Sequence, residues 1–256
     1  MNTTIILTWI FLGLIAYLLG SIPFGFLIAK LYGVDVRTVG SKNIGATNVF
    51  RTVGKFSGIL TFILDMGKGF FAIMLASFAD CRLSDWDLQA RLEIFEKAPP
   101  ILNATILHDA TILHNTTTPT IPELYLIPLC VFAGVCVIIG HNWTCFLRFK
   151  GGKGVATSLG VILALIPQGA VFALLVWVAV LLLSRIVSLA SITAAAALGA
   201  YVWYDYVSPD VLWPPIVITI LALLAIAKHH ANIRRLLNGT EPRVSFSRKP
   251  KPSAEP

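Results

Sequence analysis

Three polar, basic segments stand between long apolar runs, and their residue types suit phosphate binding. The first begins at Arg37 and ends at Arg51. Glycines let the backbone approach an anion closely, and main-chain N–H groups, hydroxyls and amides suit phosphate oxygens. Arginine adds bidentate, charge-assisted contacts. The candidate phosphate ligands are Gly40, Ser41, Asn43, Gly45, Thr47, Asn48 and Arg51, with an ordinary polar turn as the alternative.

The second segment is a glycine-rich, lysine-bearing turn that precedes another apolar run. A helix N-terminus attracts anions because its unpaired N–H groups and its dipole both point at them. The alternative is a basic loop that only sets membrane topology, but such a loop does not need interleaved glycines. The candidate ligands here are Lys150, Gly151, Gly152, Lys153 and Gly154.

The third segment follows the last apolar run and contains His229 and Asn232, with Glu241 further on. Residues three apart share one face of a helix. A histidine can transfer a proton near neutral pH, and an asparagine oxygen can fix its tautomer. The alternative is a basic cap where the helix meets the membrane interface.

Other polar residues lie within or beside the apolar runs. Asp65 and Lys68 are functional candidates because ionisable groups are costly inside a membrane, although an i,i+3 structural pair is an equal alternative. Arg185 and Ser188 open a later helix and offer a guanidinium and a hydroxyl. Helix packing through small residues is the alternative for Ser188.

The composition indicates an integral membrane protein. Of 256 residues, 56% are hydrophobic and 13% are charged, with mean hydropathy +0.79. Soluble domains carry about 25% charged residues. The net charge of +7 lies in short loops, which suits anionic membrane lipids and phosphate substrates better than nucleic acid. The four cysteines form no CxxC pair, so no zinc or disulfide framework is indicated, and the sequence shows no need for a metal or another cofactor.

Apolar run lengths predict an all-α integral membrane protein of seven short transmembrane helices, since a span needs about 20 apolar residues. The expected spans are 5–31, 58–79, 124–141, two helices between 155 and 183 separated near Pro167, 188–206 and 213–227. Lysine and arginine gather in the loops on one side, which places the N-terminus outside and the C-terminus in the cytoplasm.

Residues 1–241 are expected to form a single membrane-embedded domain. Within it, residues 80–123 are expected to form an extracytoplasmic loop that carries a tandem Ala-Thr-Ile-Leu-His repeat. Residues 242–256 are rich in Pro, Ser and Lys and are expected to be a disordered, basic cytoplasmic tail.

Several motifs, in this order, resemble the bacterial acyl-phosphate:glycerol-3-phosphate acyltransferase family (PlsY). They cover nearly the whole chain apart from the outer loop and the extreme tail. The motifs are Gly20-Ser-Ile-Pro23, Gly40-Ser-x-Asn-x-Gly-Ala-Thr-Asn-Val-x-Arg51, Asp65-x-x-Lys-Gly69, Gly140-His-x-Trp143, Phe149-Lys-Gly-Gly-Lys-Gly-Val-Ala-Thr157, Ser188-Leu-Ala-Ser191, His229-x-x-Asn-Ile-x-Arg-Leu236 and Gly239-x-Glu241.

The resemblance implies a seven-helix enzyme of phospholipid biosynthesis in the bacterial cytoplasmic (inner) membrane, with its site facing the cytoplasm. It implies transfer of a fatty acyl group from acyl phosphate to the 1-hydroxyl of sn-glycerol 3-phosphate, giving lysophosphatidic acid and phosphate. Neither coenzyme A nor acyl carrier protein would be the direct donor.

The resemblance also implies residue roles. Ser41, Asn43 and Arg51 would hold the donor phosphate and its carbonyl, and the Lys150–Gly154 loop, helped by Ser188, would hold glycerol 3-phosphate. His229, Asn232 and Glu241 match positions that the family needs for activity. The chain departs from the family at Lys42, where glycine is usual, and at Thr144, where proline is usual.

No nucleophile–base pair is evident, so we expect the acceptor hydroxyl to attack directly without an acyl-enzyme. His229 or an oxygen of the donor phosphate would take the proton. The alternative function is an organic-phosphate transporter, which also uses basic, glycine-rich turns. Ionisable groups cluster on one membrane face, apart from Asp65 and Lys68, which speaks against a path through the bilayer.

Overall fold

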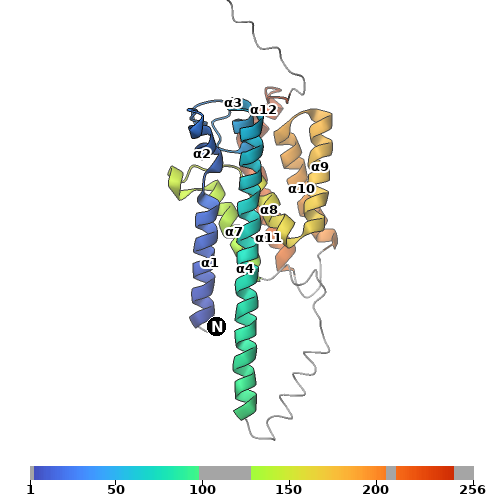
Figure 1. The fold of residues 1–256 in the computed structure, drawn as a ribbon. Helices are drawn as coiled ribbons and strands as arrows, with labels where there is room; N and C mark the ends of the chain where they lie inside the picture. Colours follow the sequence, from blue (N-terminus) through green and yellow to red (C-terminus); the bar gives the residue numbers. More distant parts are fainter. Residues whose placement is uncertain (1–2, 98–127, 206–211, 245–256) are drawn as a thin grey trace, which may run out of the picture. The chain divides into compact units, whose positions relative to one another are not determined.

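The computed structural model describes residues 3–97, 128–205 and 212–244. Within these ranges all regular secondary structure is helical (Figure 1). The chain divides into two compact units, Met1–Pro167 and Gln168–Pro256, which are treated separately below as unit 1 and unit 2. The expected tandem repeat and most of the expected tail lie outside the described residues.

Unit 1 contains two long helices that pack on a shared partner. Its elements are α1 (Thr3–Ser21), α2 (Phe24–Leu31), α3 (Ala46–Thr52), α4 (Lys55–Lys97), α7 (Pro128–Asn142), the short 3-10 helix η1 (Cys145–Leu147) and α8 (Val155–Leu165). Helix α1 packs on α7, and α4 packs on both α7 and α8. A Cβ on Gly20 would overlap the α7 backbone, and one on Gly160 would overlap the α4 backbone. Small residues therefore allow the close helix contacts that a membrane interior favours.

The first predicted span is a broken helix. Helix α1 ends at Ser21 and α2 starts at Phe24, on either side of Pro23, which lacks a backbone N–H. Side chains from elsewhere satisfy the carbonyls at the break. Thr144 Oγ1 donates to the Ser21 carbonyl at 2.5 Å, and Lys68 Nζ donates to the Ile22 carbonyl at 3.0 Å. Such partners make an interrupted helix tolerable within a membrane.

Unit 2 is a helical hairpin extended by a bent pair. It contains α9 (Pro167–Ser184, whose first residue falls in unit 1), α10 (Val187–Asp205), α11 (Trp213–Ala227) and α12 (His230–Leu237). Two indole N–H groups tie neighbouring helices together: Trp177 Nε1 donates to Ser191 Oγ at 3.1 Å, and Trp203 Nε1 donates to Thr219 Oγ1 at 2.8 Å. Helices α11 and α12 meet at a bend of 57°.

Five described helical segments are long and apolar enough to cross a membrane, and the bent α11–α12 pair makes up to six. The five are Ile6–Leu31, Lys55–Ala79, Pro128–Leu147, Pro167–Ser184 and Val187–Asp205. The predicted break near Pro167 is confirmed, since α8 ends at Leu165 and α9 begins at Pro167. Helix α8 has 11 residues, so at about 1.5 Å per residue it is shorter than the membrane core is thick. The expected seventh span stays a prediction.

Helix α4 continues beyond the second predicted span. That span was expected at 58–79, and the apolar segment of membrane-crossing length is Lys55–Ala79, but the helix runs on to Lys97, giving 43 residues (Figure 1). Residues 80–97, the start of the expected extracytoplasmic loop, are therefore helical, and their position outside the membrane stays a prediction. No glycine or proline occurs from Asp80 to Lys97, and Pro99 and Pro100 follow. Charged residues mark where an apolar span stops, but they do not stop a helix, which continues until a breaking residue.

Candidate active site

Asn48 organises the first loop of unit 1. Its buried amide Nδ2 donates to the carbonyls of Val36 at 2.9 Å, Val39 at 3.2 Å and Asn43 at 2.9 Å. Its Oδ1 accepts from the Ser41 backbone N–H at 2.9 Å. Both ends of the amide are therefore engaged within the loop. Asn48 was predicted as a substrate ligand, and here it sets the conformation of the loop.

The other predicted residues of this loop differ in exposure. Ser41, Thr47 and Arg51 are exposed, with Arg51 in the last turn of α3. Asn43 is half-buried, and its Oδ1 accepts from the Gly45 backbone N–H at 2.8 Å. Gly40 has φ +59°, and a Cβ there would overlap the Asn48 carboxamide oxygen, so glycine is required. The loop thus presents a hydroxyl-rich, arginine-bearing edge on a rigid support.

The second loop, Lys150–Gly154, packs tightly on the end of α7. The Gly152 backbone N–H donates to the His141 carbonyl at 2.9 Å, and a Cβ on Gly152 would overlap the His141 imidazole. Gly154 directly precedes α8, as the sequence predicted. Lys150 is exposed and Lys153 is half-buried. The close approach to His141 explains why glycines occur here and argues against a loop that serves topology alone.

The two loops line one cavity of about 650 Å³, which we call the cationic cavity. Its cationic side chains are Arg37, Lys42, Arg148 and Lys150, and its other lining residues are Asp35, Thr38, Ile44, Phe146, Leu147 and Gly151. Of the predicted ligands, Lys150 and Gly151 line it. Arg37, Lys42 and Arg148 were not assigned as ligands, although their charge in the same two loops was a usable signal.

Only one cation of the cavity has a protein carboxylate against it in the described ranges. Arg37 donates through Nε and Nη2 to Asp35, with an Nη2–Oδ2 distance of 2.7 Å. These hydrogen bonds lower the pKa of Asp35 to about 2. No described side chain pairs with Lys42, Arg148 or Lys150. The cavity therefore keeps a positive field, which suits phosphate.

Asp65 and Lys68 form a buried pair in α4, with 2.9 Å between Lys68 Nζ and Asp65 Oδ1. Asp65 Oδ1 also lies 3.5 Å from His141 Nδ1, and Lys68 Nζ also reaches the Ile22 carbonyl. Lys68 is 3% exposed. These contacts favour the structural alternative for the pair, because the ammonium group stabilises the α1–α2 break. They also connect that break, through His141, to the second loop.

In unit 2, Glu241 closes a cluster that we call the Glu241 clasp. Its Oε1 accepts from Ser188 Oγ at 2.7 Å and from Asn232 Nδ2 at 2.6 Å, and its Oε2 accepts from Arg235 Nε at 2.6 Å. Burial acts to raise the pKa of Glu241, but the three hydrogen bonds and the guanidinium outweigh it, so the pKa lies below its usual value. The clasp joins α10, α12 and the segment after α12.

His229 lies at the bend between α11 and α12 and is 3% exposed. Its Nδ1 lies 2.8 Å from the Ala225 carbonyl. A carbonyl only accepts, so Nδ1 carries the proton and Nε2 holds the lone pair of the neutral ring. This is the tautomer of a general base acting through Nε2. The Ala225 carbonyl fixes the tautomer, a role that the sequence assigned to an asparagine oxygen.

Arg185 has φ +60° and is exposed, and its backbone carbonyl accepts from the Val244 N–H at 2.7 Å. The guanidinium is therefore presented from a strained turn between α9 and α10. The Ser188 hydroxyl is already used by Glu241. Within unit 2 the structure brings Ser188, Asn232 and Glu241 into direct contact, with His229 three residues before Asn232.

These features define an all-helical membrane protein that presents cations and glycine-bearing loops to anionic ligands. The family model described as "Glycerol-3-phosphate acyltransferase" matches residues 10–239. A glycerol-3-phosphate acyltransferase of Aquifex aeolicus is 40% identical over 91% of this chain and 98% of its own length. One of Thermosynechococcus vestitus is 39% identical over 96% of this chain and 99% of its own length.

Solved structures agree. The crystal structure of PlsY, an integral membrane glycerol 3-phosphate acyltransferase, in its glycerol 3-phosphate form matches with TM-score 0.71 and 36% identity. That match covers 93% of this chain and 96% of the PlsY chain. The lysophosphatidic acid form matches with TM-score 0.69. The chain belongs to the glycerol-3-phosphate acyltransferase family and is an integral membrane acyltransferase of the PlsY type.

Proposed function

We propose that this enzyme transfers a fatty acyl group from acyl phosphate to the 1-hydroxyl of sn-glycerol 3-phosphate. The hydroxyl oxygen attacks the acyl carbonyl carbon, the bond from that carbon to the phosphate oxygen breaks, and the hydroxyl proton leaves. The products are lysophosphatidic acid and inorganic phosphate. The relatives' glycerol 3-phosphate and lysophosphatidic acid forms support this acceptor and product.

The observation that carries the proposal is the cationic cavity, which both predicted anion loops line. Two phosphate-bearing substrates repel each other, and fixed cations offset that repulsion while holding them together. Phosphate is also a good leaving group, so weak general-base assistance to the attacking hydroxyl is enough for acyl transfer. A coenzyme A thioester or an acyl carrier protein is not needed as the direct donor.

We further propose that transfer is direct, without an acyl-enzyme. The exposed Ser41 hydroxyl has no base assigned to it by the described contacts, and the Ser188 hydroxyl donates to Glu241. A carboxylate whose pKa is depressed is a weak base, so Glu241 activates Ser188 poorly. The acceptor's proton passes to His229 Nε2 or to an oxygen of the donor phosphate.

The proposed setting is the bacterial cytoplasmic membrane, with seven spans, the N-terminus outside and the C-terminus and active site on the cytoplasmic side. The short α8 and the α11–α12 pair would supply the spans beyond the five long segments. The concentration of Lys and Arg in alternate loops supports this orientation. Residues 1–241 would act as one membrane-embedded domain.

The test uses full-length enzyme in nanodiscs, labelled glycerol 3-phosphate and, in parallel, palmitoyl phosphate, palmitoyl-coenzyme A or palmitoyl-acyl carrier protein. We expect labelled lysophosphatidic acid from palmitoyl phosphate alone, and its loss in Arg51→Ala. Lys55→Ala, an exposed cation close in sequence that is not among the predicted ligands, is the matched control. Product from a thioester donor would contradict the proposed donor, and a trapped acyl-serine in quenched enzyme would contradict direct transfer.

A further inference from the structure

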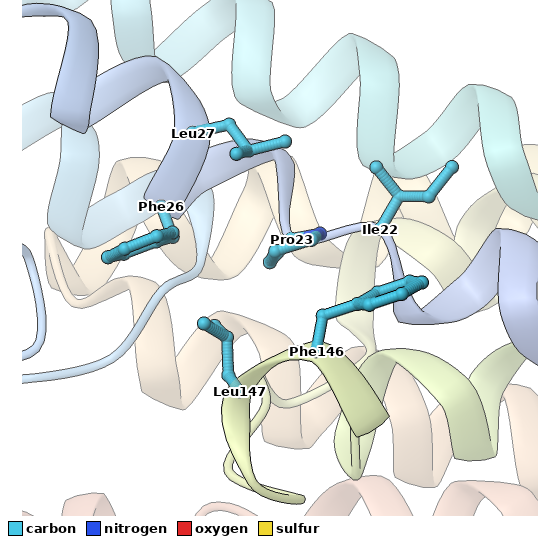
Figure 2. A pocket seen from close by; sticks show the side chains of 6 residues that line it. All are labelled: Ile22, Pro23, Phe26, Leu27, Phe146 and Leu147. Carbon is cyan, nitrogen blue, oxygen red and sulfur yellow. The ribbon is translucent and has the colours of Figure 1, made fainter.

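The break between α1 and α2 adjoins an apolar cavity of about 340 Å³, which we call the apolar pocket (Figure 2). A cavity offers the chain few packing contacts, so the break depends on polar partners. One partner is Lys68, whose Nζ donates to the Ile22 carbonyl at 3.0 Å. The pocket is lined by Ile22, Pro23, Phe26, Leu27, Phe146 and Leu147.

Buried ionisable groups continue from Lys68 to the end of α7. Lys68 Nζ lies 2.9 Å from Asp65 Oδ1, and the same carboxylate oxygen lies 3.5 Å from His141 Nδ1. Lys68 and Asp65 are each 3% exposed, and His141 is 5% exposed. Water screens such buried contacts little. The imidazole is therefore held with its Nδ1 toward the carboxylate.

His141 contacts the second loop through both its backbone and its ring. Its carbonyl accepts from the Gly152 backbone N–H at 2.9 Å. A Cβ on Gly151 would overlap that carbonyl, and a Cβ on Gly152 would overlap the imidazole Nε2. The carbonyl and the ring thus occupy the space that side chains at these two positions would need. Both glycines are required by the contact with His141.

The part of the loop that His141 contacts is next to the part that reaches a ligand. Lys150 and Gly151 line the cationic cavity, and Gly152 follows them in the chain. A shift of the imidazole would therefore move one wall of that cavity. His141 also connects the loop to α4 through Asp65, so the loop is supported by two helices of unit 1.

We propose that His141 is a positioning residue for glycerol 3-phosphate. Its carbonyl and imidazole set the conformation of the Lys150–Gly154 loop, and Asp65 orients the imidazole. This rests on the proposed function and on the expectation from the sequence that this loop binds the phosphate of glycerol 3-phosphate. His141 acts through the loop, so its effect is on affinity: lysines and backbone N–H groups must reach the phosphate oxygens together.

The experiment measures equilibrium binding of labelled glycerol 3-phosphate to full-length enzyme in phosphatidylcholine nanodiscs, with melting temperatures recorded alongside. We expect His141→Ala to raise the dissociation constant Kd about tenfold, because small misplacements of binding groups have effects of up to about 100-fold. We expect Gly152→Ala to raise Kd about 30-fold, because its Cβ meets a ring that Asp65 holds in place.

The double variant Gly152→Ala/His141→Ala tests the contact itself. Without the imidazole, the new Cβ no longer meets a ring. We therefore expect the Kd of the double variant to equal that of His141→Ala instead of the product of the two single effects. Gly151→Ala is the matched control, because its Cβ overlaps a backbone carbonyl that any residue at position 141 retains. Adding His141→Ala to Gly151→Ala should bring no recovery.

His141→Phe tests the part assigned to Asp65. This variant keeps an aromatic ring and loses the nitrogen that faces the carboxylate. We expect its Kd for glycerol 3-phosphate to rise about threefold, because the ring stays in the space but is no longer oriented by a polar contact. A wild-type Kd in His141→Phe would overturn the role of Asp65.

Two results would overturn the positioning role of His141. One is a Kd in the double variant equal to the product of the single effects. The other is a lowered melting temperature in His141→Ala with an unchanged Kd, which is the result for a purely structural histidine. No binding to wild type would contradict the proposed function as well. Because the experiment contains no acyl donor, failure of the proposed donor leaves its outcome unaffected.

Discussion

The cationic cavity of unit 1 and the Glu241 clasp of unit 2 use similar residues in opposite ways. In the cavity, Lys42, Arg148 and Lys150 have no described protein partner. In the clasp, Arg235, Ser188 and Asn232 all bond to one buried carboxylate. Cationic side chains that line a cavity without a carboxylate partner are available to bind an anionic ligand. Side chains that hydrogen-bond to one another hold chain segments together. The first arrangement should govern affinity and the second stability.

The expected changes in unfolding free energy support the same division between the cavity and the clasp. Exposed charges add little to stability, so removing one should leave unfolding unchanged. Breaking a buried, hydrogen-bonded charge leaves its partners unsatisfied and costs much more. The following variants test this division, beginning with the largest expected effect.

The buried Lys68 belongs with the satisfied charges, even though the sequence made it a ligand candidate. Lys68→Met leaves Asp65 without its ammonium partner and the Ile22 carbonyl without its donor. We expect a loss of about 3–5 kcal/mol of unfolding free energy. Thermal unfolding in detergent measures it, with Lys55→Met as control. If the Lys68→Met enzyme were as stable as wild type but had a raised KM for a phosphate substrate, Lys68 would be a substrate ligand.

Glu241→Gln weakens all three clasp contacts. We expect a loss of about 2 kcal/mol, seen as a lower melting temperature, with little change in KM. Because the pKa of folded Glu241 lies below its ordinary value of 4.5, the stabilisation is complete above that value and is lost as pH falls through the folded pKa. The melting difference between the variant and wild type should therefore be constant from neutral pH downward and shrink only in acid. A difference that shrinks near neutral pH would contradict this account.

Lys150→Gln removes one unpaired cation from the cavity. We expect KM for glycerol 3-phosphate or the donor to rise about tenfold, with an unchanged melting temperature. The penalty should diminish at high salt, because mobile ions screen exposed charges. Initial rates at several salt concentrations test this, with Lys55→Gln beside it. Equal KM values in Lys150→Gln and Lys55→Gln would show that Lys150 does not bind the substrate phosphate.

The smallest effect is expected from Asp35→Asn, which frees Arg37 from its carboxylate. KM for phosphate substrates should fall by no more than about threefold, because the cavity becomes more positive. Since the pKa of Asp35 is about 2, its charge is constant across ordinary assay conditions. The wild-type to variant ratio of KM should therefore not vary between pH 6 and pH 9, taken as roughly the working range. A ratio that varies with pH would show that another group is responsible.

The sequence predicted the parts of the molecule that depend on local chemistry. Pro167 breaks the helix where expected, because proline cannot continue one. Both glycine-bearing loops contribute to one cavity, although Lys150 and Gly151 are the only predicted ligands that line it among the described residues. The extension of α4 to Lys97 was missed because hydropathy measures where a span ends and not where a helix ends.

Other features depend on side-chain direction, which spacing does not reveal. Asn48 reads as a phosphate ligand in the sequence, yet its amide points inward to three carbonyls of its own loop. Lys42 and Arg148 reach the cavity from left-handed backbone. The glycine that is usual in the family at position 42 is a signal for that conformation, whereas the sequence offers no such signal at Arg148. The apolar pocket joins η1 to the α1–α2 break, two segments more than a hundred residues apart in the chain.

The most direct test of the division between cavity and clasp is a crossed measurement on Lys150→Gln and Glu241→Gln. Equilibrium binding of labelled glycerol 3-phosphate and of dodecyl phosphate, an unreactive alkyl phosphate, is measured for both in nanodiscs together with the melting temperature. The account predicts that Lys150→Gln weakens phosphate binding with unchanged melting, and that Glu241→Gln lowers melting with nearly unchanged binding. The reverse pattern, or loss of both properties in both variants, would contradict it.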